Sequence, residues 1–95
     1  PIVTITTPSF DEYKLPSKGS QEISSNATDS SGISEMKIYF DSKVIKTCSR
    51  GSSCKTNLSS QFIKSLISGT HTIVVTSTDN SIKKNIGTKS RTVVK

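Results

Sequence analysis

Residues 70–79 read THTIVVTSTD, and this stretch decides the fold class. In an extended strand, every second side chain of this stretch points to the same face, and these side chains are His71, Ile73, Val75 and Ser77. A pattern with a period of two is typical of a strand that buries one face. Thr, Val and Ile also fit the pleated surface of a sheet. We therefore expect a strand over residues 70–79, with Ile73 and Val75 in the core.

Shorter runs with the same alternation lie on both sides of this strand, separated by turn-forming Gly, Pro, Asp, Asn and Ser. These runs are Val3–Ile5, Ile23–Ala27, Glu35–Phe40, Val44–Ile45, Lys55–Leu58 and Arg91–Val94. Together with the central strand they make about seven short strands, a number typical of a β-sandwich. The sequence therefore predicts an all-β, antiparallel sandwich.

One stretch has helical spacing instead. Phe62, Ile63 and Leu66 would share one face of a helix, Ser60 can cap its start, and Gly69 can end it. We expect one short helical turn near 61–67 that closes an end of the sandwich, because so short a helix is not stable alone.

Length and charge restrict the classes of function. The 95 residues suffice for a single domain over residues 1–95, with a net charge of +6. The lysines are scattered, and Arg50 and Arg91 are the only arginines, whereas nucleic-acid sites favour a basic stripe interleaved with aromatics. We expect no nucleic-acid partner and, without a long apolar run, no membrane insertion. Because no targeting segment precedes the first strand, we expect a processed protein or one domain of a longer chain.

The chain has two cysteines, Cys48 and Cys54, separated by Ser-Arg-Gly-Ser-Ser. A metal site is the alternative to a disulfide, but this spacing is not one that zinc sites use and no second ligand pair exists. We expect a disulfide, and hence an oxidising, extracellular setting. Closing a loop of about seven residues would stabilise the fold by about 2.4 kcal/mol in the chain-entropy model.

The order of the runs resembles that of bacterial Ig-like domains, which occur as tandem repeats in secreted and cell-surface proteins. The matching segments are residues 1–8 (PIVTITTP), 27–34 (ATDSSGIS), 36–41 (MKIYFD), 44–47 (VIKT) and 68–80 (SGTHTIVVTSTDN). The resemblance implies an immunoglobulin-like sandwich whose cysteine pair closes a hairpin between neighbouring strands. It also implies a spacer, stalk or adhesion module and no particular ligand. The segment between Cys54 and Gly69, and the Ile82-Lys83-Lys84 loop, depart from the family's pattern.

Few residues are suited to chemistry. His71 is the only histidine and no serine has a paired base, so we expect His71 to pack at a strand corner and the chain not to be an enzyme. Asp29 and Asp79 follow strands that should open at one end of the sandwich, where calcium is conceivable. Asx turns at both aspartates are the stronger interpretation, and no cofactor is expected.

A binding face is the remaining candidate site. Lys37, Tyr39, Asp41 and Val74 should point outward from one sheet, where a tyrosine beside lysines can contact a surface glycan or a protein ligand. Asn26 and Asn57 each begin an N-glycosylation sequon, which chance alone readily produces in a chain rich in Ser and Thr.

We therefore expect a non-catalytic structural or adhesive module that is secreted or attached to the cell surface. Its partners would be neighbouring Ig-like domains or identical subunits. Two alternatives remain open: a self-assembling filament subunit joined through its first and last strands, and a carbohydrate-binding accessory domain of a secreted hydrolase.

Overall fold

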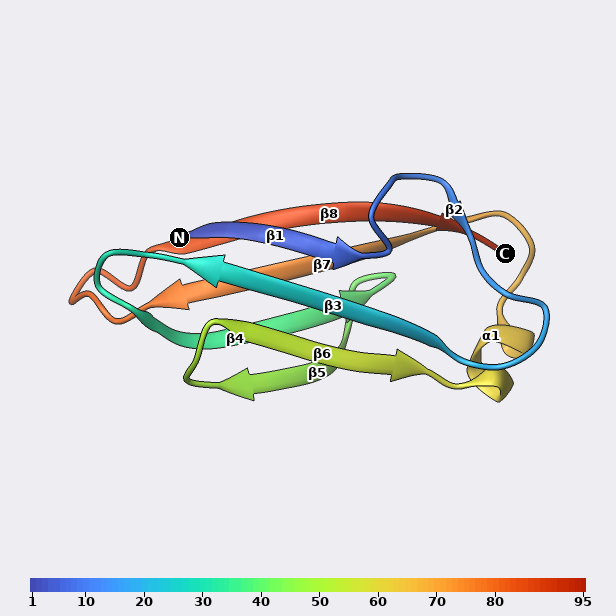
Figure 1. Ribbon diagram of the computed structural model, residues 1–95, viewed down its shortest axis with the longest axis horizontal. Helices are drawn as coiled ribbons and strands as arrows, with labels where there is room; N and C mark the ends of the chain where they lie inside the picture. The colour runs from blue at the N-terminus through green and yellow to red at the C-terminus, as the bar shows by residue number, and fades with distance from the viewer.

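Two sheets pack face to face in the computed structural model, which describes all residues from Pro1 to Lys95 (Figure 1). The three-stranded sheet has the order β1 (Ile2–Thr7), β3 (Gln21–Thr28), β6 (Ser53–Leu58). The five-stranded sheet has the order β2 (Tyr13–Lys14), β8 (Ile86–Val94), β7 (Thr70–Asp79), β4 (Ile33–Phe40), β5 (Lys43–Ser49). The predicted immunoglobulin-like sandwich is confirmed. It has one strand more than expected, because the two-residue β2 pairs with β8.

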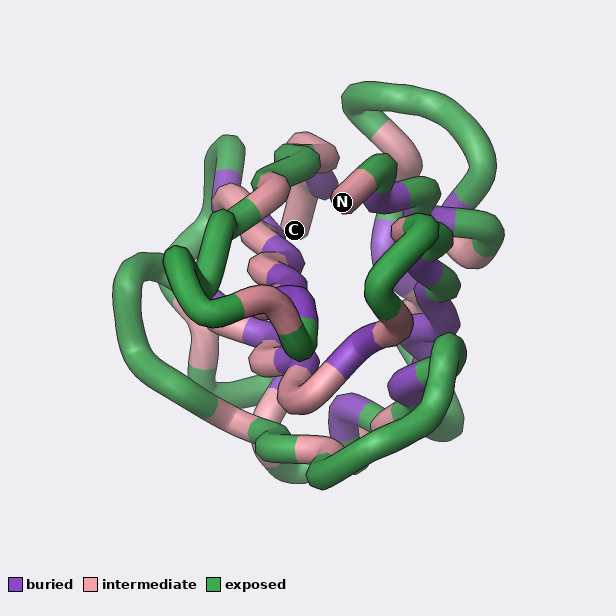
Figure 2. The backbone as a smooth tube through the Cα atoms, turned by 90° about the vertical axis from the view of Figure 1, so that its left-hand side faces the viewer, coloured by how far each residue is buried: buried purple, intermediate pink, exposed green.

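The core lies between the sheets and is built by the predicted alternation. Along β7, buried side chains alternate with half-buried ones from His71 to Asp79, and Ile73 and Val75 are fully buried. Figure 2 shows this alternation as purple and pink or green segments along the strands. The expected core residues Ile5, Ile38 and Phe40 are buried as well.

The first strand changes sheets within a few residues. β1 pairs antiparallel with β3, and the chain then crosses over so that β2 pairs in parallel with β8. The Arg91 guanidinium spans this crossing, donating from Nε to the Pro8 carbonyl and from Nη2 to the Ile5 carbonyl, both at 3.0 Å. Gly87 lies so close to Pro1 that a Cβ there would collide with the Pro1 backbone. The sandwich is therefore closed on the side where β1 meets β8.

On the opposite side, the disulfide joins the sheets. Cys48 on β5 and Cys54 on β6 are bonded, with their Cα atoms 5.7 Å apart. The predicted pairing is confirmed, but its expected place within a hairpin of neighbouring strands is wrong. β5 pairs only with β4 and β6 only with β3, so the two strands are consecutive in sequence yet lie in different sheets.

The helix α1 (Ser60–Ser65) follows β6. Its N-cap is Ser59, one residue earlier than expected, and the Ser59 hydroxyl accepts the Phe62 N–H at 3.1 Å. It ends at Ser65, before Gly69, and the Lys95 ammonium donates to the Ile63 carbonyl at 2.6 Å. No helix has the length and apolar character needed to cross a membrane.

Candidate functional site

His71 forms a hydrogen-bonded corner at the start of β7. Its Nδ1 lies 2.6 Å from Asp41 Oδ2, its Nε2 lies 2.8 Å from the Ile67 carbonyl oxygen, and its ring stacks on Phe40. The second oxygen of Asp41 accepts the Thr72 N–H at 3.0 Å. The expected packing role of His71 is confirmed, and both of its ring nitrogens are engaged.

The protonation of this corner follows from these contacts. The hydrogen bond to Asp41, and then the bond to the Ile67 carbonyl, raise the pKa of His71 above its ordinary value. Burial acts to raise the pKa of Asp41, but the hydrogen bonds from His71 and Thr72 outweigh it and leave the pKa below its ordinary value. The corner therefore favours an imidazolium paired with a carboxylate.

Asp29 and Asp79 each organise a turn. Asp29 Oδ2 accepts from the Ser31 N–H and hydroxyl, and these bonds lower its pKa to about 2. Asp79 Oδ1 accepts from the Ser81 N–H and hydroxyl and from the Asn85 N–H. Both aspartates adopt the Asx-turn arrangement that was the alternative to calcium binding. No group of three or more His, Cys, Asp or Glu residues is arranged to hold a metal ion.

The expected outward face of the five-stranded sheet is assembled in part. Tyr39 and Val74 face each other as register partners on β4 and β7, and with Ser42 and Thr76 they line a shallow hollow. Lys37 lies on the same strand as Tyr39, with its ammonium 3.7 Å from Glu35. Asp41 does not belong to this face, because the turn after β4 directs its carboxylate to His71. With Asp41 turned to His71, Lys37, Tyr39 and Val74 remain on the adjacent strands β4 and β7, and a binding role for this face stays a prediction.

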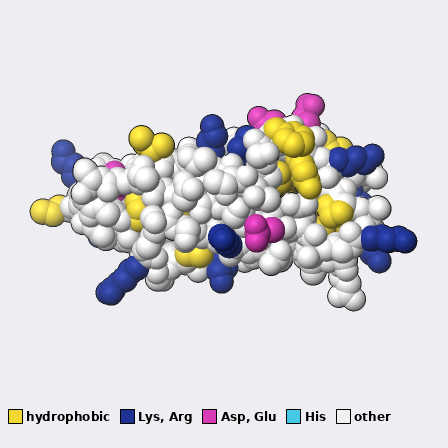
Figure 3. Space-filling model, viewed as in Figure 1, with side chains coloured by type: hydrophobic (Ala, Val, Ile, Leu, Met, Phe, Trp, Pro, Cys, Tyr) yellow, Lys and Arg dark blue, Asp and Glu magenta, His cyan; other side chains and the backbone are white.

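Asn26 on β3 and Asn57 on β6 are both exposed. Figure 3 shows Lys and Arg side chains spread around the visible outline of the molecule, with no continuous basic stripe on this face.

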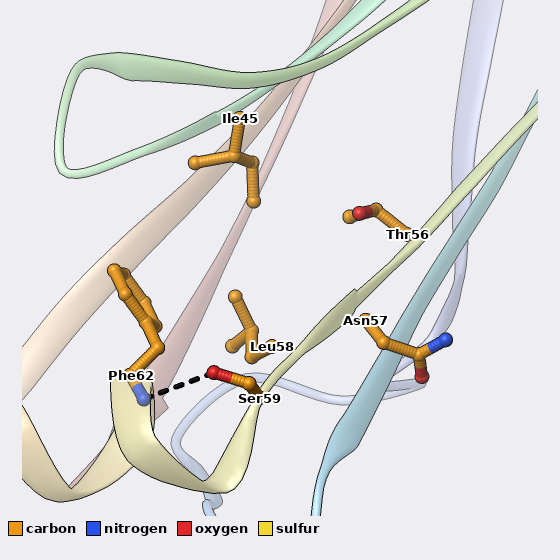
Figure 4. A pocket seen from close by; sticks show the side chains of 6 residues that line it. All are labelled: Ile45, Thr56, Asn57, Leu58, Ser59 and Phe62. Carbon is orange, nitrogen blue, oxygen red and sulfur yellow. Dashed lines mark hydrogen bonds between the residues drawn. The ribbon is translucent and has the colours of Figure 1, made fainter.

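A second hollow, which the sequence analysis missed, lies between the free edges of β5 and β6. It has a volume of about 230 Å³, and its lining consists of Ile45, Thr56, Asn57, Leu58, Ser59 and Phe62. In Figure 4, Ile45 and Phe62 point toward each other across the space from β5 and α1, with Leu58 between them. No local pattern in the sequence marks this hollow, because its walls come from β5, β6 and α1.

Comparisons with known proteins agree with the fold. The family model described as a bacterial Ig domain matches residues 1–75. Among solved structures, the chain is similar to the fibronectin(III)-like modules of CbhA from Clostridium thermocellum, with 21% identity and a TM-score of 0.69, over 98% of this chain and 94% of that chain. It is also similar to a lytic polysaccharide monooxygenase from Jonesia denitrificans, with 18% identity and a TM-score of 0.55, over 86% of this chain and 56% of that chain. At such identities the likeness concerns the fold alone. No curated protein matches the sequence.

Proposed function

Because the chain belongs to the bacterial Ig domain family, we propose that it is a non-catalytic spacer or stalk module of a secreted or cell-surface protein. The observation that supports this role is the shape of the domain. The sandwich measures 43 × 20 × 19 Å, and its N- and C-termini lie toward opposite ends of the long axis (Figure 1). A module of this form can be joined head to tail, so that each copy lengthens a rod.

A disulfide and a set of side-chain hydrogen bonds hold the two sheets together, which suits a spacer. The disulfide joins the two sheets on one side, and the Arg91 bonds close the other. A disulfide persists in oxidising compartments, which supports an extracellular setting.

Small-angle scattering on engineered arrays tests the proposal. We expect the single domain to be a monomer in light scattering, and arrays of two and four copies to lengthen by roughly one module length per copy. Spontaneous growth of the single domain into large polymers would refute the spacer role and favour the filament subunit instead. Collapsed arrays, whose maximum dimension hardly grows with copy number, would also refute it.

The hollow at Tyr39 favours a second candidate, a carbohydrate-binding accessory domain. Tyr39 and Val74 offer an apolar surface, and Ser42 and Thr76 supply hydroxyl groups beside it. A glycan array tests this candidate. Binding that Tyr39→Ala abolishes and Thr88→Ala preserves would support it, whereas a blank array would remove its support.

A further inference from the structure

We propose that the free edge of β6 binds an extended acidic peptide segment, which adds as a fourth strand and places an apolar side chain in the hollow between Ile45, Leu58 and Phe62. The partner is a polypeptide segment of another protein. This inference goes beyond the spacer role and does not depend on it.

No strand of the three-stranded sheet lies beyond β6. The space beside this edge lies toward Thr56–Leu58, because at Cys54 the disulfide holds Cys48 of β5 at a Cα–Cα distance of 5.7 Å. The three-stranded sheet ends at β6, while the facing five-stranded sheet continues from β4 to β5. In Figure 1, β5 runs along the lower border of the sandwich beside β6, and no further strand follows β6 in its sheet. Since β6 has β3 as its only partner, half of its backbone N–H and C=O groups point toward the vacant position. An extended peptide can use these groups through β-augmentation.

The side chains beneath the vacant position are apolar and only partly covered. Ile45 on β5, and Phe62 and Leu66 around α1, are half-buried at the border of the core, whereas Leu58 is fully buried. The hollow of about 230 Å³ is lined by Ile45, Leu58 and Phe62 together with Thr56, Asn57 and Ser59 of the β6 end, and it has room for an apolar side chain. Alternate side chains of a strand point to one face, so a peptide at this edge would direct every second residue toward the hollow.

The charge around the edge selects the partner. Residues 42–78, which include β5, β6 and α1, contain no Asp or Glu. The same segment has five basic side chains, and these are Lys43, Lys46, Arg50, Lys55 and Lys64. Glu22 on β3 is the register partner of Asn57, so the surroundings of the edge are not purely basic. The basic side chains of β5, β6 and α1 outnumber it, which favours the encounter with a peptide that carries acidic residues.

The same charges argue against a second copy of this chain as the occupant. Lysines on an edge strand are a common means of preventing pairing between identical edges, because like charges would be brought together. Two copies joined through β6 would bring two cationic surfaces into contact. An acidic partner removes this repulsion.

An acidic glycan could pair with the basic side chains, but it could not form the regular series of hydrogen bonds that the free edge of β6 offers. The unpaired backbone groups along β6 have the regular spacing of a strand, which a peptide backbone matches group for group and a sugar chain does not. The proposal therefore predicts dependence on backbone N–H groups as well as on charge.

The test uses the acetylated, amidated peptide EVELEVE, the basic peptide KVKLKVK, and an EVELEVE derivative N-methylated at alternate residues on its strand-pairing edge. Isothermal titration calorimetry gives the affinity, and NMR shift changes locate the site. We expect EVELEVE to bind with shifts centred on Ser53–Leu58, and both other peptides to bind at least about tenfold more weakly. The double variant Lys46→Glu, Lys55→Glu should lower the affinity for EVELEVE by at least about tenfold. The matched control Lys89→Glu should change that affinity by less than about twofold.

Three results would overturn the proposal. They are the absence of EVELEVE binding, equal binding of the N-methylated peptide, and equally strong competition by an oligogalacturonate of similar charge. Equal binding of the N-methylated peptide, or equal competition by the oligogalacturonate, would indicate a site that recognises any polyanion by its charge. The circular dichroism spectrum of each variant, compared with that of the unmodified chain, distinguishes lost binding from lost folding.

Discussion

The imidazole of His71 and the carboxylate of Asp41 lie 2.6 Å apart and connect the start of β7 with the turn between β4 and β5. The other ring nitrogen of His71 holds the Ile67 carbonyl, which belongs to the segment between α1 and β7. A carboxylate and a carbonyl can both only accept, so the two bonds together require both ring nitrogens to be protonated. One side chain thus holds three segments when it is charged.

This arrangement predicts how stability depends on pH. The pKa of His71 is raised in the folded state, so its contribution is complete below the unfolded-state value near 6.5 and is lost as pH rises through the folded-state pKa. We expect the free energy of unfolding, measured with urea, to fall over that range. The positive charge of Lys95 lowers the pKa of His71 only weakly, and Asp41 is the main cause of its rise. The variant Asp41→Asn should therefore remove much of the dependence of the unfolding free energy on pH. An unchanged slope in that variant would contradict the role of the pair.

Arg91 should be important because it supports the crossing of the first strand. Arg91→Ala removes the donors to the Pro8 and Ile5 carbonyls, and we expect it to lower the free energy of unfolding by about 1–3 kcal/mol. Lys89→Ala, an exposed position on the same strand, should change it by less than about 0.5 kcal/mol. Urea denaturation of both variants checks the prediction, and equal effects would contradict it.

The disulfide should stabilise the domain without being essential to it. We expect the double variant Cys48→Ala, Cys54→Ala to remain folded while losing about 2–3 kcal/mol of stability. Amide hydrogen exchange should accelerate in β5 and β6, the two edges that the bond holds together, and much less in the central β7. Complete unfolding of the variant at room temperature would disagree with this expectation. Mass spectrometry with and without reductant first verifies the bond.

Gly87 on β8 lies directly against Pro1, the residue before β1, on the closed side of the sandwich. A methyl group at this position would collide with the Pro1 backbone, so Gly87→Ala should displace β1 from β8. We expect a loss of about 1–3 kcal/mol, as for other overpacked sites. Thr88→Ala, at the next position and exposed, is the matched control. Unchanged NMR shifts along β1 in Gly87→Ala would show that the close approach does not constrain the strand.

The alternation of side chains predicted most strands and their buried faces. Residues 70–79 form β7 with the expected bounds, and Met36, Ile38 and Phe40 of β4 are all buried. The last strand was underestimated, because β8 begins at Ile86, five residues before Arg91. Its first half has exposed threonine, lysine and serine and therefore lacks an apolar alternation.

Site residues were harder to predict than strands. Asp41 was expected on an outward face because it follows Tyr39 by two positions. However, the chain turns there, with positive φ angles of 48° at Asp41 and 72° at Ser42, and the strand period no longer applies. The hollow at Ile45 was missed because its walls come from β5, β6 and α1.

The sequence by itself determined the class of the fold, most of its strands and the pairing of its two cysteines. These are local properties, since side-chain period, turn residues and a short loop between two thiols can be read within a few residues. Only the tertiary structure decided that the disulfide joins two sheets, that Arg91 and Gly87 close one side, and that β6 has a free edge on the other. The physical reason is that a period of two specifies which face of a strand is buried but not which strand pairs with it. Pairing depends on how all the strands share one core.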